Sequence, residues 1–216
     1  MSFRRYLENK YTTASVMQEA IYRDQEMVVM LTSGPQDADL VRTWMRDYGL
    51  FQGITTQNRN AVVKQFLHFA RQHERTGRQP SAADIEALFT ELLTALHRQV
   101  PRSWVSASSK LLWCLYPQTA VIYDAFVHRA LVVMQCLDND LADFPRIGAA
   151  PRIGSEADIA LAVRHYMNYY AMVHQLLSVH RELLNNLRNK YGVTYPYDIR
   201  IIDKVLWMIG NPRQAY

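Results

Sequence analysis

Apolar residues recur every three or four positions along most of the chain, which is the periodicity of an α-helix with one buried face. No segment sustains the apolar–polar alternation of a half-buried strand. N-cap residues such as Ser81 and Ser155, together with glycines and prolines, mark the ends of the periodic segments. The expected helices span about residues 14–31, 36–48, 56–75, 81–99, 106–116, 124–137, 155–189 and 198–209. We therefore predict an all-α protein of about nine helices, with a polar lead-in over residues 1–10.

We interpret the 216 residues as a single domain, folded as two closely packed lobes. Residues 100–137 form a central motif region, and residues 155–210 hold the C-terminal helices. The long irregular segment between them contains a short duplication, Pro145-Arg-Ile-Gly and Pro151-Arg-Ile-Gly. Arg146 and Arg152 in this duplication are candidates for phosphate contact, although a solvated loop is the simpler interpretation.

The central region contains two isolated charges in core-like sequence. Lys110 is the only charged residue between Arg102 and Asp124, and Asp124 precedes an apolar run. Because a buried charge is costly unless it is paired or used, both residues are candidates for chemistry. Asp124 is either a helix N-cap or a catalytic carboxylate, or both. Lys110 is a nucleophile, the ion-pair partner of a carboxylate such as Asp124 or Asp203, or a side chain whose head reaches solvent.

Composition excludes several classes of protein. No apolar stretch is long enough to span a membrane, and the N-terminus does not resemble a signal peptide. Cys114 and Cys136 lie in apolar helical pattern and suggest buried thiols in a reducing, cytoplasmic compartment. His165, His174 and His180 lack metal-ligand spacing, so we expect hydrogen-bonding histidines and no metal. No phosphate-binding glycine loop is present and no cofactor is expected, while a net charge of +4 permits a nucleic-acid partner.

The central region carries a resemblance to a known family. The segment Val121-Ile-Tyr-Asp-Ala-Phe-Val-His-Arg-Ala-Leu resembles the segment that holds the catalytic aspartate in the helix-hairpin-helix DNA glycosylase superfamily, with Asp124, Val127 and Arg129 at matching places. The run Ser108-Ser-Lys-Leu-Leu-Trp-Cys-Leu-Tyr-Pro resembles the preceding helix in the 8-oxoguanine-glycosylase-like bacterial branch. Arg200-Ile-Ile-Asp-Lys-Val-Leu-Trp-Met-Ile-Gly resembles the closing helix of those proteins. The match covers about thirty central residues and about a dozen near the C-terminus.

The chain also departs from the family. The family hairpin contains glycines that let backbone amides approach a DNA phosphate, whereas the corresponding Val100-Pro-Arg-Ser-Trp-Val-Ser contains none. A divergent hairpin would use Arg102 and the serines instead. The catalytic lysine of bifunctional members lies about nineteen residues before the aspartate, which corresponds to a place near Val105. Lys110 lies fourteen residues before Asp124, so it does not inherit the nucleophile role by alignment.

The resemblance implies an all-α, monomeric DNA glycosylase that flips a damaged or modified base out of double-stranded DNA and cleaves the N-glycosidic bond. Asp124 would stabilise the positive charge that develops on the sugar, and Lys110 would give AP lyase activity if it is a nucleophile. Candidates for the base pocket are Trp104, Trp113, Tyr123, Phe126 and Trp207, and candidates for DNA contact are Arg102, Ser106, Ser108, Ser109, Arg129 and Arg200. The tyrosines at 166, 169 and 170 are interpreted as core packing.

The substrate stays open between oxidised bases of the cell's own DNA and modified bases of phage DNA. Two other classes of function also stay open. A non-catalytic, helical DNA-binding or adaptor module would bind DNA without releasing a base. A helical protein-interaction domain would show negligible DNA binding, because phosphate contacts make affinity fall with salt.

Overall fold

The computed structural model describes residues 2–21, 24–73, 79–192 and 195–213. This part of the chain contains ten α-helices, two 3-10 turns and no strand, which confirms the prediction of an all-α protein. The helices are α1 (Phe3–Ile21), α2 (Asp24–Ser33), α3 (Ala38–Asp47), α4 (Thr56–Gln72), α5 (Ala82–Gln99), α6 (Val105–Leu115), α7 (Ala125–Leu137), α8 (Ile159–Val179), α9 (Arg181–Tyr191) and α10 (Asp198–Gly210). None of the helices in the described ranges is long and apolar enough to cross a membrane.

Three of the expected helix boundaries differ from the structure. The expected helix over residues 14–31 corresponds to parts of α1 and α2, and the two residues between these helices lie outside the described ranges. The N-terminus is not a polar lead-in, because α1 begins at Phe3 and buries Phe3, Leu7, Tyr11 and Ala14 on one face. The expected helix over residues 155–189 is interrupted at His180, a buried residue that separates α8 from α9. The capping box at the start of α5 is present as the sequence predicted.

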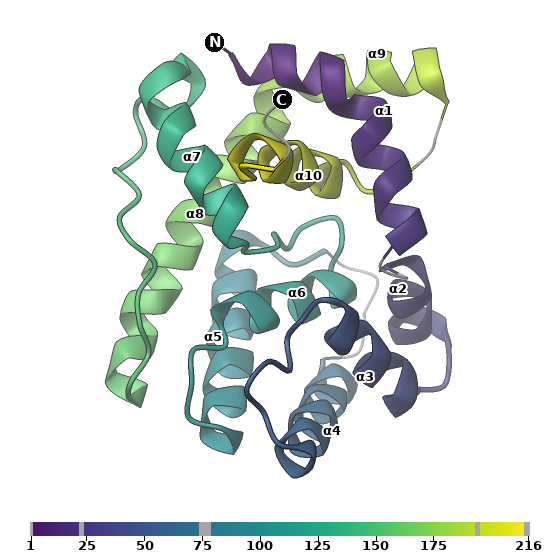
Figure 1. Cartoon of the computed structure of the whole chain (residues 1–216), viewed down its shortest axis with the longest axis vertical. Helices are drawn as coiled ribbons and strands as arrows, with labels where there is room; N and C mark the ends of the chain where they lie inside the picture. The colour runs from purple at the N-terminus through teal and green to yellow at the C-terminus, as the bar shows by residue number, and fades with distance from the viewer. Residues whose placement is uncertain (1, 22–23, 74–78, 193–194, 214–216) are drawn as a thin grey trace.

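The helices form two groups in Figure 1. Helices α2 to α6 occupy the lower half of the view, α1, α7, α9 and α10 occupy the upper half, and α8 runs along one side of both. Contacts between α5 and α8, and between α10 and α8, join the groups. Helix α6 lies at the middle of the molecule and is almost completely buried, so its side chains are enclosed by both groups.

Helix α10 packs closely against the first turn of α7. A Cβ atom on Gly210 would lie 1.8 Å from the carbonyl oxygen of Phe126 and 3.1 Å from the amide nitrogen of Ala130. Only glycine lets the two backbones approach this closely. The contact fixes α10 relative to the residue that caps α7, which is Asp124.

Candidate active site

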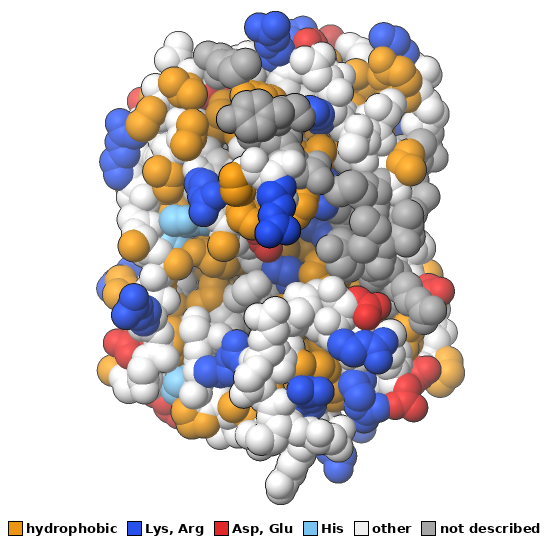
Figure 2. Space-filling view, viewed as in Figure 1, with side chains coloured by type: hydrophobic (Ala, Val, Ile, Leu, Met, Phe, Trp, Pro, Cys, Tyr) orange, Lys and Arg blue, Asp and Glu red, His pale blue; other side chains and the backbone are white. Residues whose placement is uncertain are grey.

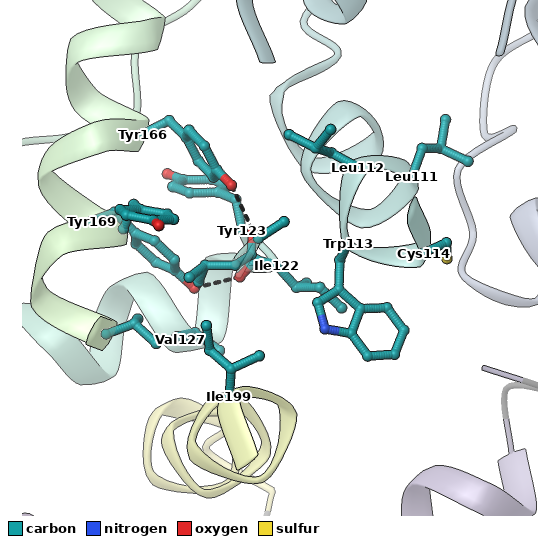
Figure 3. Close-up of a cluster of buried hydrophobic side chains, with 14 of the residues drawn as sticks. Leu111, Leu112, Trp113, Cys114, Ile122, Tyr123, Val127, Tyr166, Tyr169 and Ile199 are labelled. Atoms are coloured by element: carbon teal, nitrogen blue, oxygen red, sulfur yellow. Dashed lines mark hydrogen bonds between the residues drawn. The ribbon is translucent and has the colours of Figure 1, made fainter. Parts of the chain in front are cut away.

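The segment that precedes α7 has no regular secondary structure, and side chains satisfy its backbone. The hydroxyl groups of Tyr166 and Tyr169 on α8 donate hydrogen bonds to the carbonyl oxygens of Val121 and Ile122, at 2.9 and 2.8 Å (Figure 3). Both tyrosines and Tyr170 are buried, which confirms that this run packs in the core. The bonds fix the path of the chain into Asp124, because a buried backbone group needs a partner.

Lys110 anchors the same segment from α6. Its Nζ atom lies 3.1 Å from the carbonyl oxygen of Tyr123, 2.8 Å from Ser106 Oγ and 3.6 Å from Asp124 Oδ2. The first two contacts are hydrogen bonds, and the third is an ion pair that is slightly too long for a hydrogen bond. Of the three interpretations open from the sequence, the structure places Lys110 as the buried ion-pair partner of Asp124.

The two oxygen atoms of Asp124 have different partners. Oδ1 accepts a hydrogen bond from the amide of Phe126 at 2.9 Å, so Asp124 caps α7 as the sequence predicted. Oδ2 faces Lys110. The Asp124 side chain keeps 28% of its surface exposed, whereas Lys110 keeps 5%. The carboxylate is therefore the member of the pair that a bound molecule can reach.

One face of α10 completes the site. Arg200, Asp203, Lys204 and Trp207 are spaced as residues i, i+3, i+4 and i+7, which places them on one side of the helix. Arg200 forms an ion pair with Asp203, as the sequence suggested, and both side chains are buried. The Nζ atom of Lys204 lies 3.7 Å from the centre of a Trp207 ring.

Asp24, the first residue of α2, is buried beside this face of α10 and contacts Arg200. It accepts hydrogen bonds from Trp44 at 3.2 Å, Tyr48 at 2.9 Å and Tyr195 at 3.2 Å, and from Arg200 at 3.4 Å. Sequence reasoning missed Asp24, because a carboxylate at the start of a helix looks like an ordinary favourable charge near the N-terminus. The donors lie 20 to 176 residues away in the chain, so no local pattern identifies the cluster.

These side chains line a cavity of about 120 Å³ between the two helix groups. The lining residues are Asp47, Tyr48, Lys110, Ile122, Asp124, Arg200, Asp203, Lys204 and Trp207. Figure 2 shows a hollow at mid-height of one face of the molecule, with Lys and Arg side chains above it and within it. The cavity brings together residues from α3, α6, α10 and the start of α7, and it contains both residues expected to be catalytic.

Burial changes the acid–base properties of the lining groups. It lowers the pKa of Lys110 against the opposing effect of Asp124 and raises that of Asp203 to about 6 against the effect of Arg200. Burial, assisted by Arg200, lowers the pKa of Lys204 to about 8. Groups that titrate near neutral pH in an enclosed cavity are typical of functional sites.

The aromatic residues expected to hold a base lie at different depths. Trp207 lines the cavity, and Phe126 packs edge-on against it with ring centres 5.7 Å apart. Tyr123 is buried beside the cavity, where its hydroxyl group bonds His165 at 3.1 Å. Trp104 and Trp113 are enclosed in the core, and neither lines the cavity.

The candidates for DNA contact also differ in how exposed they are. Arg129 is exposed on α7, and Arg102 and Ser106 are partly exposed. Ser108 and Ser109 are completely buried, and Ser109 Oγ accepts a hydrogen bond from the Tyr123 amide. In this structure neither serine is accessible to a phosphate.

Arg200 is buried, with its guanidinium group among Asp24, Asp203 and Tyr48, so it does not lie on the outer surface where a DNA backbone would bind. Its place in the cavity wall is structural. It neutralises two carboxylates that burial would otherwise leave uncompensated, which is the condition for a stable buried charge.

The loop expected to replace the family hairpin joins α5 to α6. Arg102 in this loop donates to the carbonyl oxygen of Gln52 at 2.8 Å and lies over the Trp104 ring. The Trp104 indole in turn donates to the carbonyl oxygen of Val100. The loop is therefore held by side-chain contacts in place of the backbone freedom that glycines give.

A second cavity, of about 520 Å³, lies between the duplicated loop and α8. Arg146, Arg164, His165 and Asn168 line it together with residues of the loop. Burial, assisted by nearby His128, lowers the pKa of His165 to about 4. Cys136 is exposed nearby and contacts Arg146, so the expectation that both cysteines are buried holds only for Cys114.

Of the three histidines that the sequence analysis expected to form hydrogen bonds, two do so. His165 bonds Tyr123, and His174 bonds the carbonyl oxygen of Thr119 at 2.8 Å. His180 lies 3.6 Å from an oxygen atom of Asp140.

Comparison with known proteins finds no matching family model, no matching curated protein and no matching solved structure.

Proposed function

We propose that the chain is a DNA glycosylase that hydrolyses the N-glycosidic bond of a damaged or modified base in double-stranded DNA. The observation that carries the proposal is the Asp124 carboxylate, which lines a partly open cavity and forms an ion pair with the buried ammonium group of Lys110. This carboxylate occupies the place that the sequence resemblance assigns to the catalytic aspartate. The geometry of the cavity and the sequence resemblance therefore both support Asp124 as the catalytic residue.

The chemistry requires a carboxylate in a dry site. Cleaving the bond between C1′ and the base nitrogen sends the electron pair to the base and leaves positive charge on the sugar. Asp124 stabilises that charge, and it can orient the water that then bonds to C1′. Lys110 acts as a positioning residue, because its contacts to Tyr123 and Asp124 fix the carboxylate relative to the chain.

The cavity must enlarge to admit a nucleoside. Its volume of about 120 Å³ is below the roughly 300 Å³ at which small-molecule sites begin. Trp207 forms one wall and remains partly exposed, so we expect its ring to move when a flipped base enters. Phe126, edge-on to Trp207, would then form a second apolar surface for the base.

The test is release of free base from duplex DNA that carries a panel of oxidised, alkylated and hypermodified bases. We expect release from at least one member of the panel and none from unmodified duplex. Salt-sensitive DNA binding without release from any substrate would contradict the proposal and favour a non-catalytic DNA-binding or adaptor module. Negligible binding at all salt concentrations would instead favour a protein-interaction domain.

A further inference from the structure

The duplicated loop, residues 145–154, forms one wall of the second cavity, and the first half of α8 forms the other. Figure 1 shows the chain between α7 and α8 running beside α8 along one edge of the molecule. The cavity volume of about 520 Å³ lies within the range of small-molecule sites, roughly 300–1,000 Å³. No residue lines both this cavity and the one that contains Asp124, so the chemistry proposed there does not use it.

Contacts from α7 and α8 hold the loop in place. The two halves of the duplication bury Ile147 and Ile153, each 7% exposed. The side-chain oxygen of Gln135 accepts a hydrogen bond from the Ile147 amide at 3.0 Å, and its nitrogen donates to the Pro145 carbonyl oxygen at 3.1 Å. Asn168 donates to the same carbonyl oxygen at 3.2 Å. The cavity is therefore formed before any ligand binds, which reduces the entropy that binding would cost.

The charged side chains of this cavity are all basic. Arg146 and Arg164 line it and are exposed, whereas no Asp or Glu lines it. Among the residues that the structure describes, Arg164 has no hydrogen-bond or ion-pair partner, and Arg146 contacts only the sulfur atom of Cys136, a weak acceptor. Burial lowers the pKa of His165 to about 4, so this ring is neutral at neutral pH. The two guanidinium groups remain to bind an anion, and their planar donors match a carboxylate or a phosphate.

The rest of the lining is largely apolar. Pro145, Ala149, Pro151 and Leu161 contribute to it, and Leu161 is 52% exposed. Covering such a side chain with the apolar part of a ligand removes apolar surface from water, which favours binding. An inorganic anion or a DNA backbone would leave this surface uncovered, because phosphate is contacted by charged and polar groups. The combination favours a ligand with one charged end and an apolar body.

We propose that this cavity binds a small organic anion, a carboxylate or monophosphate with an apolar body, whose charged end pairs with Arg146 and Arg164. Leu161 and the two prolines contact the body. The inference goes beyond the proposed function and does not rest on it, since binding here requires neither base release nor contact with DNA.

The test titrates the full chain with two organic anions and follows the backbone amide signals by two-dimensional NMR. Phenyl phosphate is compared with phenol and octanoate with octanol, so that each body is measured with and without its charge, while inorganic phosphate supplies charge without a body. We expect at least one organic anion to bind about tenfold more tightly than both its neutral counterpart and inorganic phosphate, because hydrogen bonds to charged groups contribute about that much.

The same titration locates the site. The amide signals of Gly148 and Ala149, which line the cavity, should shift with the bound fraction of the anion. No preference for either anion over its neutral counterpart would overturn the inference. Signal shifts confined to the cavity that contains Asp124 would overturn it as well.

Replacing one arginine tests the charged end. Arg164→Gln should weaken binding of the preferred anion about tenfold and leave binding of its neutral counterpart unchanged. Arg181→Gln is the matched control, because Arg181 is exposed on α9 and does not line the cavity. Binding by Arg164→Gln at the wild-type affinity would contradict the inference.

Replacing Leu161 tests the apolar body. Leu161→Asn should weaken binding of the organic anion and leave that of inorganic phosphate unchanged. Leu137→Asn is the control, because Leu137 is 53% exposed on α7 and does not line the cavity. Both leucines are exposed, so neither variant should unfold the protein. An unchanged affinity of Leu161→Asn for the organic anion would contradict the contact with its body.

A DNA backbone is the other anion that two exposed arginines would attract. In that case Arg164→Gln would reduce the salt dependence of duplex DNA binding, and no organic anion would bind in preference to its neutral counterpart. This pair of results would overturn the inference and make the duplicated loop part of a DNA-binding surface. Loss of organic-anion binding in Arg164→Gln, with an unchanged salt dependence for duplex DNA, would support the inference.

Discussion

Lys110 and Asp124 show how one pair of side chains can serve both structure and chemistry. Replacing Lys110 by Met keeps an apolar stem of similar length but leaves the Tyr123 carbonyl group and one side of Asp124 without a donor. We expect the free energy of unfolding to fall by about 2–3 kcal/mol, the cost of leaving buried polar groups unpaired. Urea unfolding measures it. Lys64→Met, at an exposed position on α4, is the control and should change stability little. Equal effects would show that Lys110 is not held as described.

His165 is expected to make stability depend on pH. Its pKa is about 4 in the folded protein, below its ordinary value of 6.5, because burial and His128 disfavour the charged ring. The unfolded chain therefore binds the extra proton first, so the stability that neutral His165 provides is complete above about pH 6.5 and is lost as pH falls towards 4. His165→Gln should make the urea midpoint less sensitive between pH 7 and 4.5. An unchanged sensitivity would mean that His165 does not contribute.

The sequence predicted Lys110 and Asp124 because each is an isolated charge in apolar sequence, and their spacing of fourteen residues did not show that they meet. It could not predict which serines and tryptophans face inwards. Ser108 and Trp113 lie on a helix that is buried on all sides, so no polar face distinguishes them. Asp24 and Tyr48 were missed because their partners come from distant helices.

Helix α10 positions four residues of the cavity, and its own position depends on Gly210. In Gly210→Ala the new methyl group would overlap the Phe126 carbonyl oxygen and force α10 away from α7. We expect a loss of about 2–3 kcal/mol or more, as for other overpacked contacts, and reduced base release because Lys204 and Trp207 would move. Gly148→Ala is the matched control, since nothing lies within 4 Å of its added Cβ atom. Urea unfolding of both variants gives the comparison, and similar midpoints would contradict the packing described for α10.

Most helices could be predicted because apolar periodicity, capping residues and glycine or proline breaks agree with one another. Helix α5 is an example, since both its Ser81 capping box and its end at Gln99 were expected. The break between α8 and α9 could not be predicted, because His180 has no helix-breaking character and periodicity continues across it. The start of α1 was missed although Phe3, Leu7 and Tyr11 have helical spacing, because the charged residues between them hid the apolar face.

The two groups of helices meet at the cavity, and basic side chains lie above and within the hollow at mid-height of the face in Figure 2. Arg129 is exposed on α7 and lies over the ring of Phe126, which contacts the cavity wall through Trp207. A DNA strand that delivers a base to Asp124 would pass this position. Arg129 forms no ion pair with any residue that the structure describes, and its Nη1 atom donates a hydrogen bond to the Gly210 carbonyl oxygen at 3.4 Å. If the proposed function is right, its charge would lie near a phosphate next to the flipped nucleotide.

Removing this charge should weaken DNA binding by an amount that depends on salt. Arg129→Gln should reduce the slope of log affinity against log salt concentration by about 1, because one phosphate contact releases roughly one counterion. The slope is measured by fluorescence anisotropy with duplex DNA. The salt concentration is varied from about 50 to about 200 mM, a range over which phosphate contacts change the affinity strongly. Arg4→Gln is the control, because Arg4 pairs with Glu8 on α1 and does not line the cavity. An unchanged slope for Arg129→Gln would exclude a phosphate contact there.

We propose that the Asp124 carboxylate takes part in base release as well as capping α7. Asn is as good an N-cap as Asp, so Asp124→Asn keeps the bond to the Phe126 amide and removes only the charge. Asp37→Asn makes the same change at the N-cap of α3, where the side chain accepts from the amides of Asp39 and Leu40. Circular dichroism and urea unfolding should show that both variants are folded.

The deciding measurement is the single-turnover rate of base release from the best substrate for wild type, Asp124→Asn and Asp37→Asn. We expect Asp124→Asn to lower the rate by about a hundredfold or more, the usual contribution of a catalytic carboxylate, and Asp37→Asn to leave it unchanged. Release by a folded Asp124→Asn variant at close to the wild-type rate would show that Asp124 is only a helix cap.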